Sequence, residues 1–565
     1  MRSSLVIAAV PLILLGGCAT ASKTAQAPAT PEPVVASSGY GKFLAGVGAL
    51  NEGHDHLAAA FFNQARTEDP ANGLVASHAF TAALMAGEVD KAAALAPTGE
   101  GVSEATARLG QLTVAVKDII DGKGKEAHAL LVGGTIGYPH LPAAALLAPW
   151  AAAEAGDVEG SLVRPDVSGD HVVGYFGELD QALLFERVHR YGEAETDFKA
   201  VNAAGVNDEL ATLMYGEFLE RRGRRSQAIE VYDNGLALNP DSPALKMARA
   251  RAAADRAPPP PPTVREGAAQ ALLAPTAVML SAKQDGVALA YLRLILALDP
   301  NRDEGWVLLG DLLGAQGDVA GARAAYEEPK PDAPMYAAAQ SKLAWSYQNA
   351  GDKEMALKIA RQAAASGSVD GRMTLADLLR ADERYAESAD VLTGLISEQK
   401  KPDWRLLYAR AAAYQETNRW PDAESDLKAA LAQQPDNPEL LNYLGYSWID
   451  RNEHLGQAMA MVRRAVASDP RSGAMVDSLG WAYYRLGDYN TAVQKLEQAV
   501  ELEAGDPEIN DHLGDAYWKV GRKDEALFQW RRVLTLQPDD KTKADAEAKI
   551  ASAEAPAPPQ KLAEH

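Results

Sequence analysis

The chain has 565 residues, a formal net charge of −22 and one cysteine, which excludes a disulfide within the chain. This length exceeds one ordinary compact core and suits several domains or one long repeat array. The negative charge argues against a nucleic-acid partner and against a polybasic contact with anionic lipid, because both of those surfaces are negative themselves. Aromatic residues make up only 7% of the chain and many segments are rich in alanine, which favours helices over sheet.

Residues 1–17 have the pattern of a secretory signal peptide. Arg2 supplies a short basic region, and the apolar run 5–15 is too short to cross a bilayer as a helix of the mature protein. The segment ends in Leu15, Gly16 and Gly17, directly before Cys18. These four residues resemble the bacterial lipobox, in which small residues admit the chain to the processing site and the cysteine thiol receives the lipid.

This resemblance implies that Cys18 is the lipid-attachment residue, and that two or more acyl chains such as palmitate anchor the protein stably. Ala19 follows the cysteine, and in the family pattern a residue other than aspartate at this position implies export to the outer membrane. We therefore expect the protein on the periplasmic face of that membrane. The alternative is a plain signal peptide followed by an incidental cysteine. Residues 18–38 are small, polar and proline-bearing, as in a flexible tether.

A motif recurs along the chain with a period of 34 residues. Its last two copies are Leu479, Gly480, Tyr483, Gly487, Ala492 and Leu496, then Leu513, Gly514, Tyr517, Gly521, Ala526 and Trp530. This pattern resembles the tetratricopeptide repeat, in which small residues let two helices approach and aromatics fill the remaining gap. Twelve units are readable and two more are weaker. We expect an all-α, right-handed superhelical solenoid of about 12–14 helical hairpins.

Five consecutive prolines at 258–262 divide the repeats into two blocks. We expect a degenerate first block at 39–255, a proline-rich linker at 256–266 and a second block at 267–540. As a polyproline II segment the linker would be a stiff spacer of roughly 15 Å, and a long loop inside one superhelix is the alternative. Residues 541–565 read as a polar capping helix and a disordered tail.

The sequence contains none of the common catalytic or phosphate-binding motifs. His54 and His56 are the one close histidine pair, and on a helix their side chains would point apart. We therefore expect no enzymatic activity, no cofactor, no catalytic residue and no metal site.

The resemblance implies that the first helix of each unit lines a concave surface through its second, fifth, ninth and twelfth positions. Carried over to this chain, the concave groove contains Trp345, Tyr408, Asn442, Tyr446, Asp477, Trp481, Tyr484, Glu508, Asp511, Asp515 and Trp518. Rigid aromatics are common anchors of interfaces, although they could instead only pack between helices. The acidic groups predict a neutral or basic partner segment, and no basic clamp for a terminal carboxylate is evident.

The lipobox, the tether and the long repeat array together are similar to lipoprotein adaptors of carboxyl-terminal processing proteases. This resemblance implies a non-enzymatic periplasmic scaffold that brings a protease to cell-wall hydrolases. The alternatives are a lipoprotein of envelope assembly, serving outer-membrane protein insertion, pilus assembly or exopolysaccharide export, and a peptidoglycan-binding protein that stacks sugars on the aromatic groove.

Overall fold

The computed structural model describes residues 38–204, 209–365 and 367–554. These ranges contain thirty-one helices and no strand, so the predicted all-α solenoid is confirmed. The predicted signal peptide, the lipobox with Cys18, nearly all of the tether and the last eleven residues of the tail lie outside the described ranges.

The first block comprises thirteen helices. They are α1 (Gly39–Asn51), α2 (Asp55–Glu68), α3 (Gly73–Met85), α4 (Val89–Ala94), α5 (Glu104–Ile120), α6 (Gly124–Val132), α7 (Leu141–Glu154), α8 (Val158–Ser161), α9 (His171–Arg187), α10 (Tyr191–Ala203), α11 (Glu209–Arg221), α12 (Arg225–Leu238) and α13 (Pro243–Ala253).

The second block follows the prolines. Its helices are α14 (Val264–Ala271), α15 (Leu273–Ser281), α16 (Asp285–Leu298), α17 (Asp303–Ala315), α18 (Val319–Glu327), α19 (Tyr336–Asn349), α20 (Lys353–Ala365), α21 (Val369–Ala381), α22 (Tyr385–Ser397), α23 (Trp404–Glu416), α24 (Trp420–Gln433), α25 (Pro438–Asp450), α26 (Leu455–Ser468), α27 (Gly473–Arg485), α28 (Tyr489–Leu502), α29 (Pro507–Lys519), α30 (Lys523–Val533) and α31 (Asp540–Glu554).

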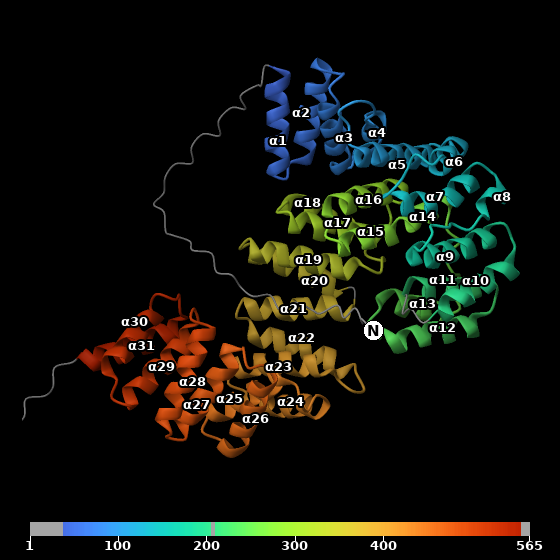
Figure 1. Ribbon diagram of the computed structural model, residues 1–565. Helices are drawn as coiled ribbons and strands as arrows, with labels where there is room; N and C mark the ends of the chain where they lie inside the picture. Colours follow the sequence, from blue (N-terminus) through green and yellow to red (C-terminus); the bar gives the residue numbers. More distant parts are fainter. Residues whose placement is uncertain (1–37, 205–208, 366, 555–565) are drawn as a thin grey trace, which may run out of the picture.

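Consecutive helices pack as antiparallel hairpins along most of the chain. With α13, α14 and α31 set aside, the remaining twenty-eight of the thirty-one described helices form fourteen such pairs. The segment 103–173, where the repeat motif is least clear, folds as α5 to α8, and α8 has only four residues. The hairpins stack side by side and form a curved array (Figure 1).

A glycine of the first helix faces a large side chain of the second helix in many hairpins. A Cβ atom at Gly514 would lie 2.5 Å from Nε1 of Trp530, and one at Gly480 would lie 2.7 Å from Leu496. The same relation, sixteen or seventeen residues apart, pairs Gly46 with Phe62, Gly216 with Tyr232, Gly310 with Tyr326 and Gly445 with Val462. No larger residue fits at these positions unless the two helices move apart.

The polar groups of Tyr326 and Trp530, two of these large side chains, also have hydrogen-bond partners. Tyr326 donates a hydrogen bond to Asp311 at 2.8 Å, and the indole of Trp530 donates to Asp515 at 3.1 Å. In both hairpins the acceptor directly follows the glycine of the close approach. Buried tyrosine and tryptophan normally need such a partner, so the aspartates contribute to hairpin packing.

The proline-rich segment leads the chain back onto the first block. Arg221 donates to the carbonyl oxygen of Pro259 at 3.2 Å, and Arg187 donates to that of Pro262 at 3.4 Å. Helix α14 then packs against α7, where a Cβ atom at Gly267 would clash with the indole ring of Trp150. The prolines therefore lie along the first block before the second block begins.

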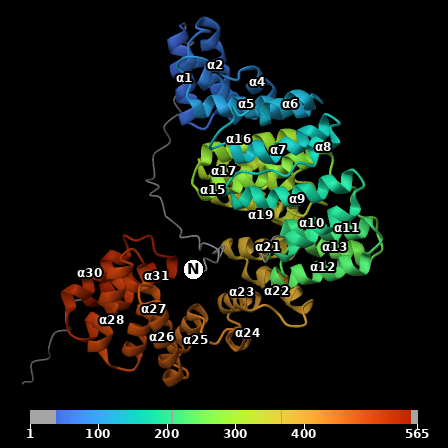
Figure 2. The same ribbon diagram turned by 45° about the vertical axis from the view of Figure 1, so that its right-hand side comes forward.

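The start of the second block continues along the inner side of the first block. Helix α16 contacts α3, α4 and α5, and Arg293 on α16 donates to the carbonyl of Met85 at 2.7 Å. Nδ1 of His140 lies 2.7 Å from the hydroxyl of Tyr291, and burial lowers the pKa of His140 to about 4, so this ring is neutral. One hydrophobic cluster runs through both blocks, from Phe80 to Leu379. Figures 1 and 2 both show α15 to α17 beside the helices of the first block.

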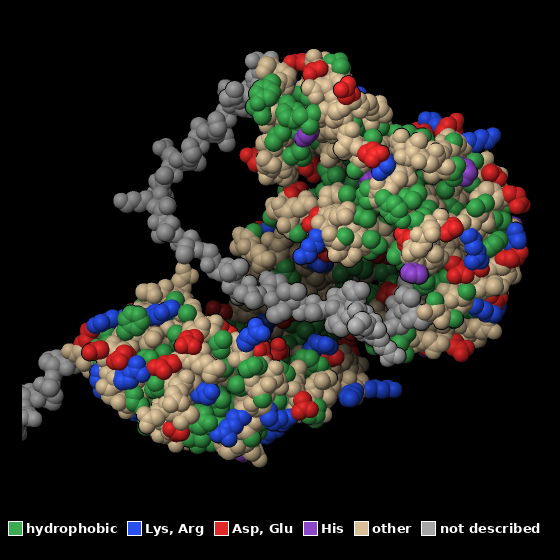
Figure 3. All heavy atoms as spheres, in the orientation of Figure 1, with side chains coloured by type: hydrophobic (Ala, Val, Ile, Leu, Met, Phe, Trp, Pro, Cys, Tyr) green, Lys and Arg blue, Asp and Glu red, His purple; other side chains and the backbone are tan. Residues whose placement is uncertain are grey.

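The later helices of the second block extend away from this joint body. They form the lobe coloured orange to red in Figures 1 and 2. Acidic and basic side chains are interspersed over the visible face of that lobe (Figure 3).

None of the helices in the described ranges is long and apolar enough to span a membrane.

We predict that Gly514→Ala destabilises the last hairpin by about 1–3 kcal/mol, because the added methyl group overlaps the indole of Trp530. Gly394→Ala in α22 is the matched control, since a Cβ atom there meets no atom within 4 Å. Alanine has the higher helix propensity, so the control is expected to be neutral or slightly stabilising. Hydrogen exchange of α29 and α30 in the full chain measures the difference. Equal exchange rates in the two variants would contradict the close-approach interpretation.

Candidate functional site

A groove runs across the inner helices of the second block, α21, α23, α25, α27 and α29. Its cavity volume is about 810 Å³, and each of these five helices or its N-cap supplies lining residues. The lining comprises three tyrosines, five acidic and two basic side chains, which are Tyr408, Tyr443, Tyr446, Asp377, Glu439, Asp477, Asp506, Glu508, Arg380 and Arg405. This volume lies within the range of protein ligand pockets.

The middle of the groove is formed by Tyr408 of α23 and by Asn442 and Tyr443 of α25. The Tyr408 and Tyr443 rings meet edge to face with centroids 5.4 Å apart, and burial raises the pKa of both hydroxyls. The Oδ1 atom of Asn442 is buried and accepts no hydrogen bond within the described residues. The two tyrosines therefore offer flat apolar faces to the groove, while the Asn442 oxygen lies beneath its surface.

The acidic end of the groove lies where α27 and the start of α29 meet. Asp506 caps α29 by accepting a hydrogen bond from the Ile509 amide at 3.0 Å. The Tyr446 hydroxyl donates to Oε1 of Glu508, so side chains of α25 and α29 touch across the inner face. Burial, followed by the charge of Glu508, raises the pKa of Tyr446, which stays protonated.

His512 lies beneath this end of the groove. Its Nδ1 atom is 3.0 Å from Asp477, and its ring stacks on Trp481 with centroids 4.0 Å apart and an interplanar angle of 11°. Trp481 in turn stacks on Tyr484 at 4.5 Å. Burial alone would lower the pKa of His512, but the charge and hydrogen bond of Asp477, with further charges from Glu508 and Asp511, raise it to about 9. An imidazolium therefore partly neutralises Asp477.

The structure places Asp515 and Trp518 beside a second, smaller hollow of about 380 Å³ next to the last helix. Lys549 of α31 reaches Asp511 at 2.7 Å and Asp515 at 2.9 Å. Burial, and then the charge of Asp515, raise the pKa of Asp511 to about 6 against the opposing effect of Lys549. Trp518 lies next to Trp530, with centroids 5.4 Å apart, and beneath the ammonium group of Lys523. These residues thus join α29 to α31.

The residues predicted for one groove are therefore divided among several surroundings. Tyr408, Asn442, Tyr446, Asp477 and Glu508 line the main groove. Tyr484, Asp515 and Trp518 line the hollow beside α31, while Trp481 and Asp511 are buried beneath the surface. Trp345 of α19 packs, half-buried, against the core shared by the two blocks and lines neither cavity.

Several lining residues were missed by the sequence reasoning. Arg405 and Glu439 occupy the second positions of α23 and α25, and Asp377 and Arg380 occupy the ninth and twelfth positions of α21. All four therefore obey the positional rule (second, fifth, ninth and twelfth positions of the first helix) that predicted the residues of the later units. Tyr443 and His512 are at sixth positions, outside that rule, and Lys549 lies in the helix expected only as a cap.

The histidine pair does not form a metal site with its surroundings. His54 precedes α2, and His56 Nδ1 lies 3.6 Å from Glu88. In the part of the chain that the structure describes, no three His, Cys, Asp or Glu side chains are grouped as metal ligands would be.

Family models described as TPR repeat or tetratricopeptide repeat match residues 209–252, 408–473, 480–521 and 507–540. A TPR repeat-containing protein of Pseudomonas aeruginosa is 36% identical over 118 residues, which are 21% of this chain and 20% of that protein. The chain thus spans about a fifth of the length of the curated relative it matches.

Solved structures of two repeat proteins also overlap with parts of the chain. A tetratricopeptide repeat protein from Parabacteroides merdae is 13% identical, with a TM-score of 0.38, and covers 45% of this chain and 99% of its own. A thermophilic TPR protein of Thermus thermophilus is 27% identical, with a TM-score of 0.29, over 32% of this chain and 96% of its own.

We predict that the local stability of α27 to α29 is fully present below about pH 6.5 and decreases as the pH rises through about 9. The folded-state pKa of His512 is raised to about 9 from the ordinary value of 6.5, so the protonated ring favours the folded state. NMR titration of the His512 ring, and denaturation followed by tryptophan fluorescence at pH 6 and 9.5, measure this effect. His512→Gln should abolish the pH dependence, whereas His54→Gln, at an exposed site, should retain it. A titration midpoint at or below 6.5 would contradict the assignment.

Proposed function

We propose that this chain, which is a tetratricopeptide-repeat protein, is an interaction scaffold that holds a segment of a partner protein in the groove of α21 to α29. Its repeats indicate protein–protein interaction in general. The observation that carries the more specific proposal is the groove of about 810 Å³, in which three tyrosines lie among charged side chains of five successive inner helices. Tyrosine supplies a large contact area with little loss of conformational entropy.

The packing of the two blocks supports the second block as the binding region. In the first block, α3 to α5, α7 and α9 contact α14 to α16, so much of the inner side of that block is covered by the chain itself. Among the described helices, those of the first block cover the inner helices from α21 onward far less, since only the start of α21 shares a pocket with the start of α13. The later helices form a lobe that extends away from the first block (Figure 1). A partner segment would therefore reach the later inner helices most readily.

We further propose that the scaffold acts as an adaptor at the periplasmic face of the outer membrane. The N-terminal sequence supports this location, because Leu15, Gly16, Gly17 and Cys18 resemble a lipobox and a proline-bearing tether follows. The combination of lipid anchor and long repeat array supports recruitment of a carboxyl-terminal processing protease to cell-wall hydrolases. Such a role needs binding surfaces and no catalytic group of its own, and repeat proteins of this fold are typically non-catalytic scaffolds.

We predict that Tyr408→Ala and Tyr443→Ala each weaken partner capture by about tenfold or more, since they remove aromatic anchors from the centre of the groove. Crosslinking in intact cells, followed by purification of the full chain and mass spectrometry, measures the recovery. Tyr138→Ala is the control, because Tyr138 is an exposed tyrosine of the first block. Recovery of a periplasmic serine protease supports the adaptor role. Recovery of only barrel-assembly or export components, or direct binding of muropeptides alone, would refute it.

We predict that Cys18→Ser releases the protein from the membrane into the soluble periplasm, because the thiol that would receive the lipid is absent. Fractionation of cells and immunoblotting of membrane and soluble fractions measure the change. Ser22→Ala is the control and should leave the protein in the membrane. Retention of Cys18→Ser in the membrane would show that the anchor lies elsewhere.

A further inference from the structure

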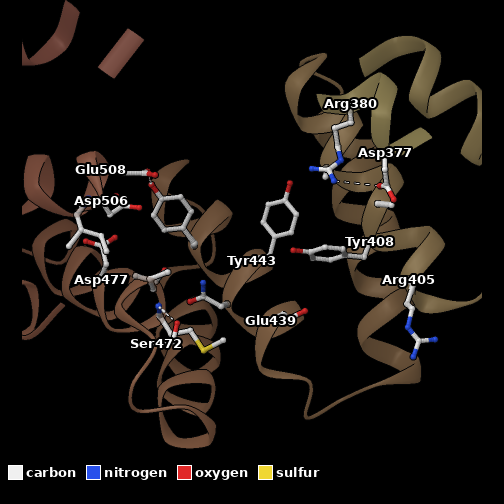
Figure 4. Close-up of a pocket in the computed structure, with 18 of the residues that line it drawn as sticks. Asp377, Arg380, Arg405, Tyr408, Glu439, Tyr443, Ser472, Asp477, Asp506 and Glu508 are labelled. Atoms are coloured by element: carbon white, nitrogen blue, oxygen red, sulfur yellow. Dashed lines mark hydrogen bonds and ion pairs between the residues drawn. The ribbon is translucent and has the colours of Figure 1, made fainter. Parts of the chain in front are cut away.

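Both basic side chains of the groove lie at its α21–α23 end, where Asp377 accompanies them, and the other lining carboxylates lie on α25, on α27 and at the start of α29. Arg380 and Arg405 come from α21 and α23, whereas Asp477 and Glu508 come from α27 and α29. Figure 4 shows Tyr408 and Tyr443 between these two sets. The residues predicted from the later units made the groove acidic, and the equivalent positions of α21 and α23 add Arg380 and Arg405 at its other end.

The basic end has hydrogen-bond donors to spare. Arg380 contacts Asp377 at 3.5 Å, and Arg405 contacts Asp403, the N-cap of α23, at 3.4 Å. The two arginine side chains are 47% and 67% exposed. A guanidinium group carries five N–H donors, and each of these carboxylates engages only part of that number. Both guanidinium groups can therefore donate hydrogen bonds to a further carboxylate, in the bidentate geometry that arginine favours.

The opposite end has carboxylate acceptors to spare. Glu508 is 60% exposed and receives the Tyr446 hydroxyl on Oε1 only. Asp506 caps α29 through Oδ1, and Asp477 shares the buried imidazolium of His512. One buried cation thus stands against three carboxylates, so this end keeps a negative charge at neutral pH.

We propose that the groove binds an extended partner segment with a carboxylate at the α21–α23 end and a lysine or arginine at the α27–α29 end. This inference rests on the proposed function, because it names the chemistry of the segment held in the same groove. A segment basic throughout its length would bring its cations against Arg380 and Arg405, and a segment acidic throughout would meet Glu508. Like charges brought together in a partly desolvated groove disfavour both alternatives.

The architecture also sets the spacing of the two charges. Packed helices lie about 8–10 Å apart, and α23 and α25 are less closely packed than α25 and α27, so the two steps from α23 to α27 cover at least roughly 18 Å. An extended chain advances about 3.3 Å per residue, so the two charges are separated by about five residues or more. The intervening residues pass Tyr408 and Tyr443, whose rings suit apolar side chains.

Selection from a random library of displayed twelve-residue peptides, with the immobilised full chain as bait, tests the proposal. The enriched peptides should carry Asp or Glu at one end and Lys or Arg about five residues or more away. With Arg380→Glu/Arg405→Glu as bait the acidic preference should disappear while the basic preference remains. With Glu508→Lys the basic preference should weaken. Arg380→Gln/Arg405→Gln is a milder variant for the same comparison, and circular dichroism verifies that each bait is folded.

The outcomes separate this inference from the proposed function. Enrichment of basic peptides without a carboxylate, or an acidic preference unchanged by both arginine variants, would overturn the charge-separated segment and leave groove binding intact. If the Tyr408→Ala and Tyr443→Ala baits also enrich the same peptides as the unchanged chain, groove binding itself is overturned, and the inference with it. Enriched peptides resynthesised with a free or an amidated C-terminus distinguish a terminal carboxylate from an Asp or Glu side chain.

Discussion

The close approach of a glycine to a large side chain, repeated in six of the hairpins, is the contact on which much of the structure depends. At Gly514 and Gly480 no room remains for a Cβ atom beside Trp530 and Leu496, and Gly310 meets Tyr326 in the same way. This contact sets the distance between the two helices of a hairpin and therefore the surface that each hairpin offers to the next one. Because the relation repeats at a constant spacing, the inner helices come into line and their equivalent residues meet on one face.

A similar glycine contact joins the two blocks. Gly267 of α14 lies against the indole of Trp150 of α7, far away in the sequence, and the prolines before it are held by Arg187 and Arg221. The block that begins after the prolines is thus covered at its start and open at its later helices. This arrangement explains why the groove lies between α21 and α29, since much of the inner side of the first block is already used for packing within the chain.

Packing between helices engages several of the acidic residues on the inner face. Asp515 accepts hydrogen bonds from Trp530 and Lys549, and Asp511 is held by Lys549, so carboxylates on the inner face serve the joint with α31. Glu508 and the two arginines, by contrast, keep much of their exposure and their hydrogen-bonding capacity. Position along an inner helix therefore does not by itself make a residue available to a partner. The neighbouring helix decides which of them remain free.

The sequence by itself determined the helical hairpins and their period, because these follow from the local spacing of small and aromatic residues, and the resemblance to tetratricopeptide repeats implied several residues of the inner face. The positional rule reached Tyr408, Asn442, Tyr446 and Asp477, and applied to earlier units it would have reached Arg380 and Arg405 as well. Only the tertiary structure decided that α14 to α16 cover the first block, that Trp345 packs, half-buried, against the core and that His512 stacks under the acidic end. Contacts between residues far apart in the chain depend on the accumulated curvature of many hairpins, and no single repeat encodes that curvature.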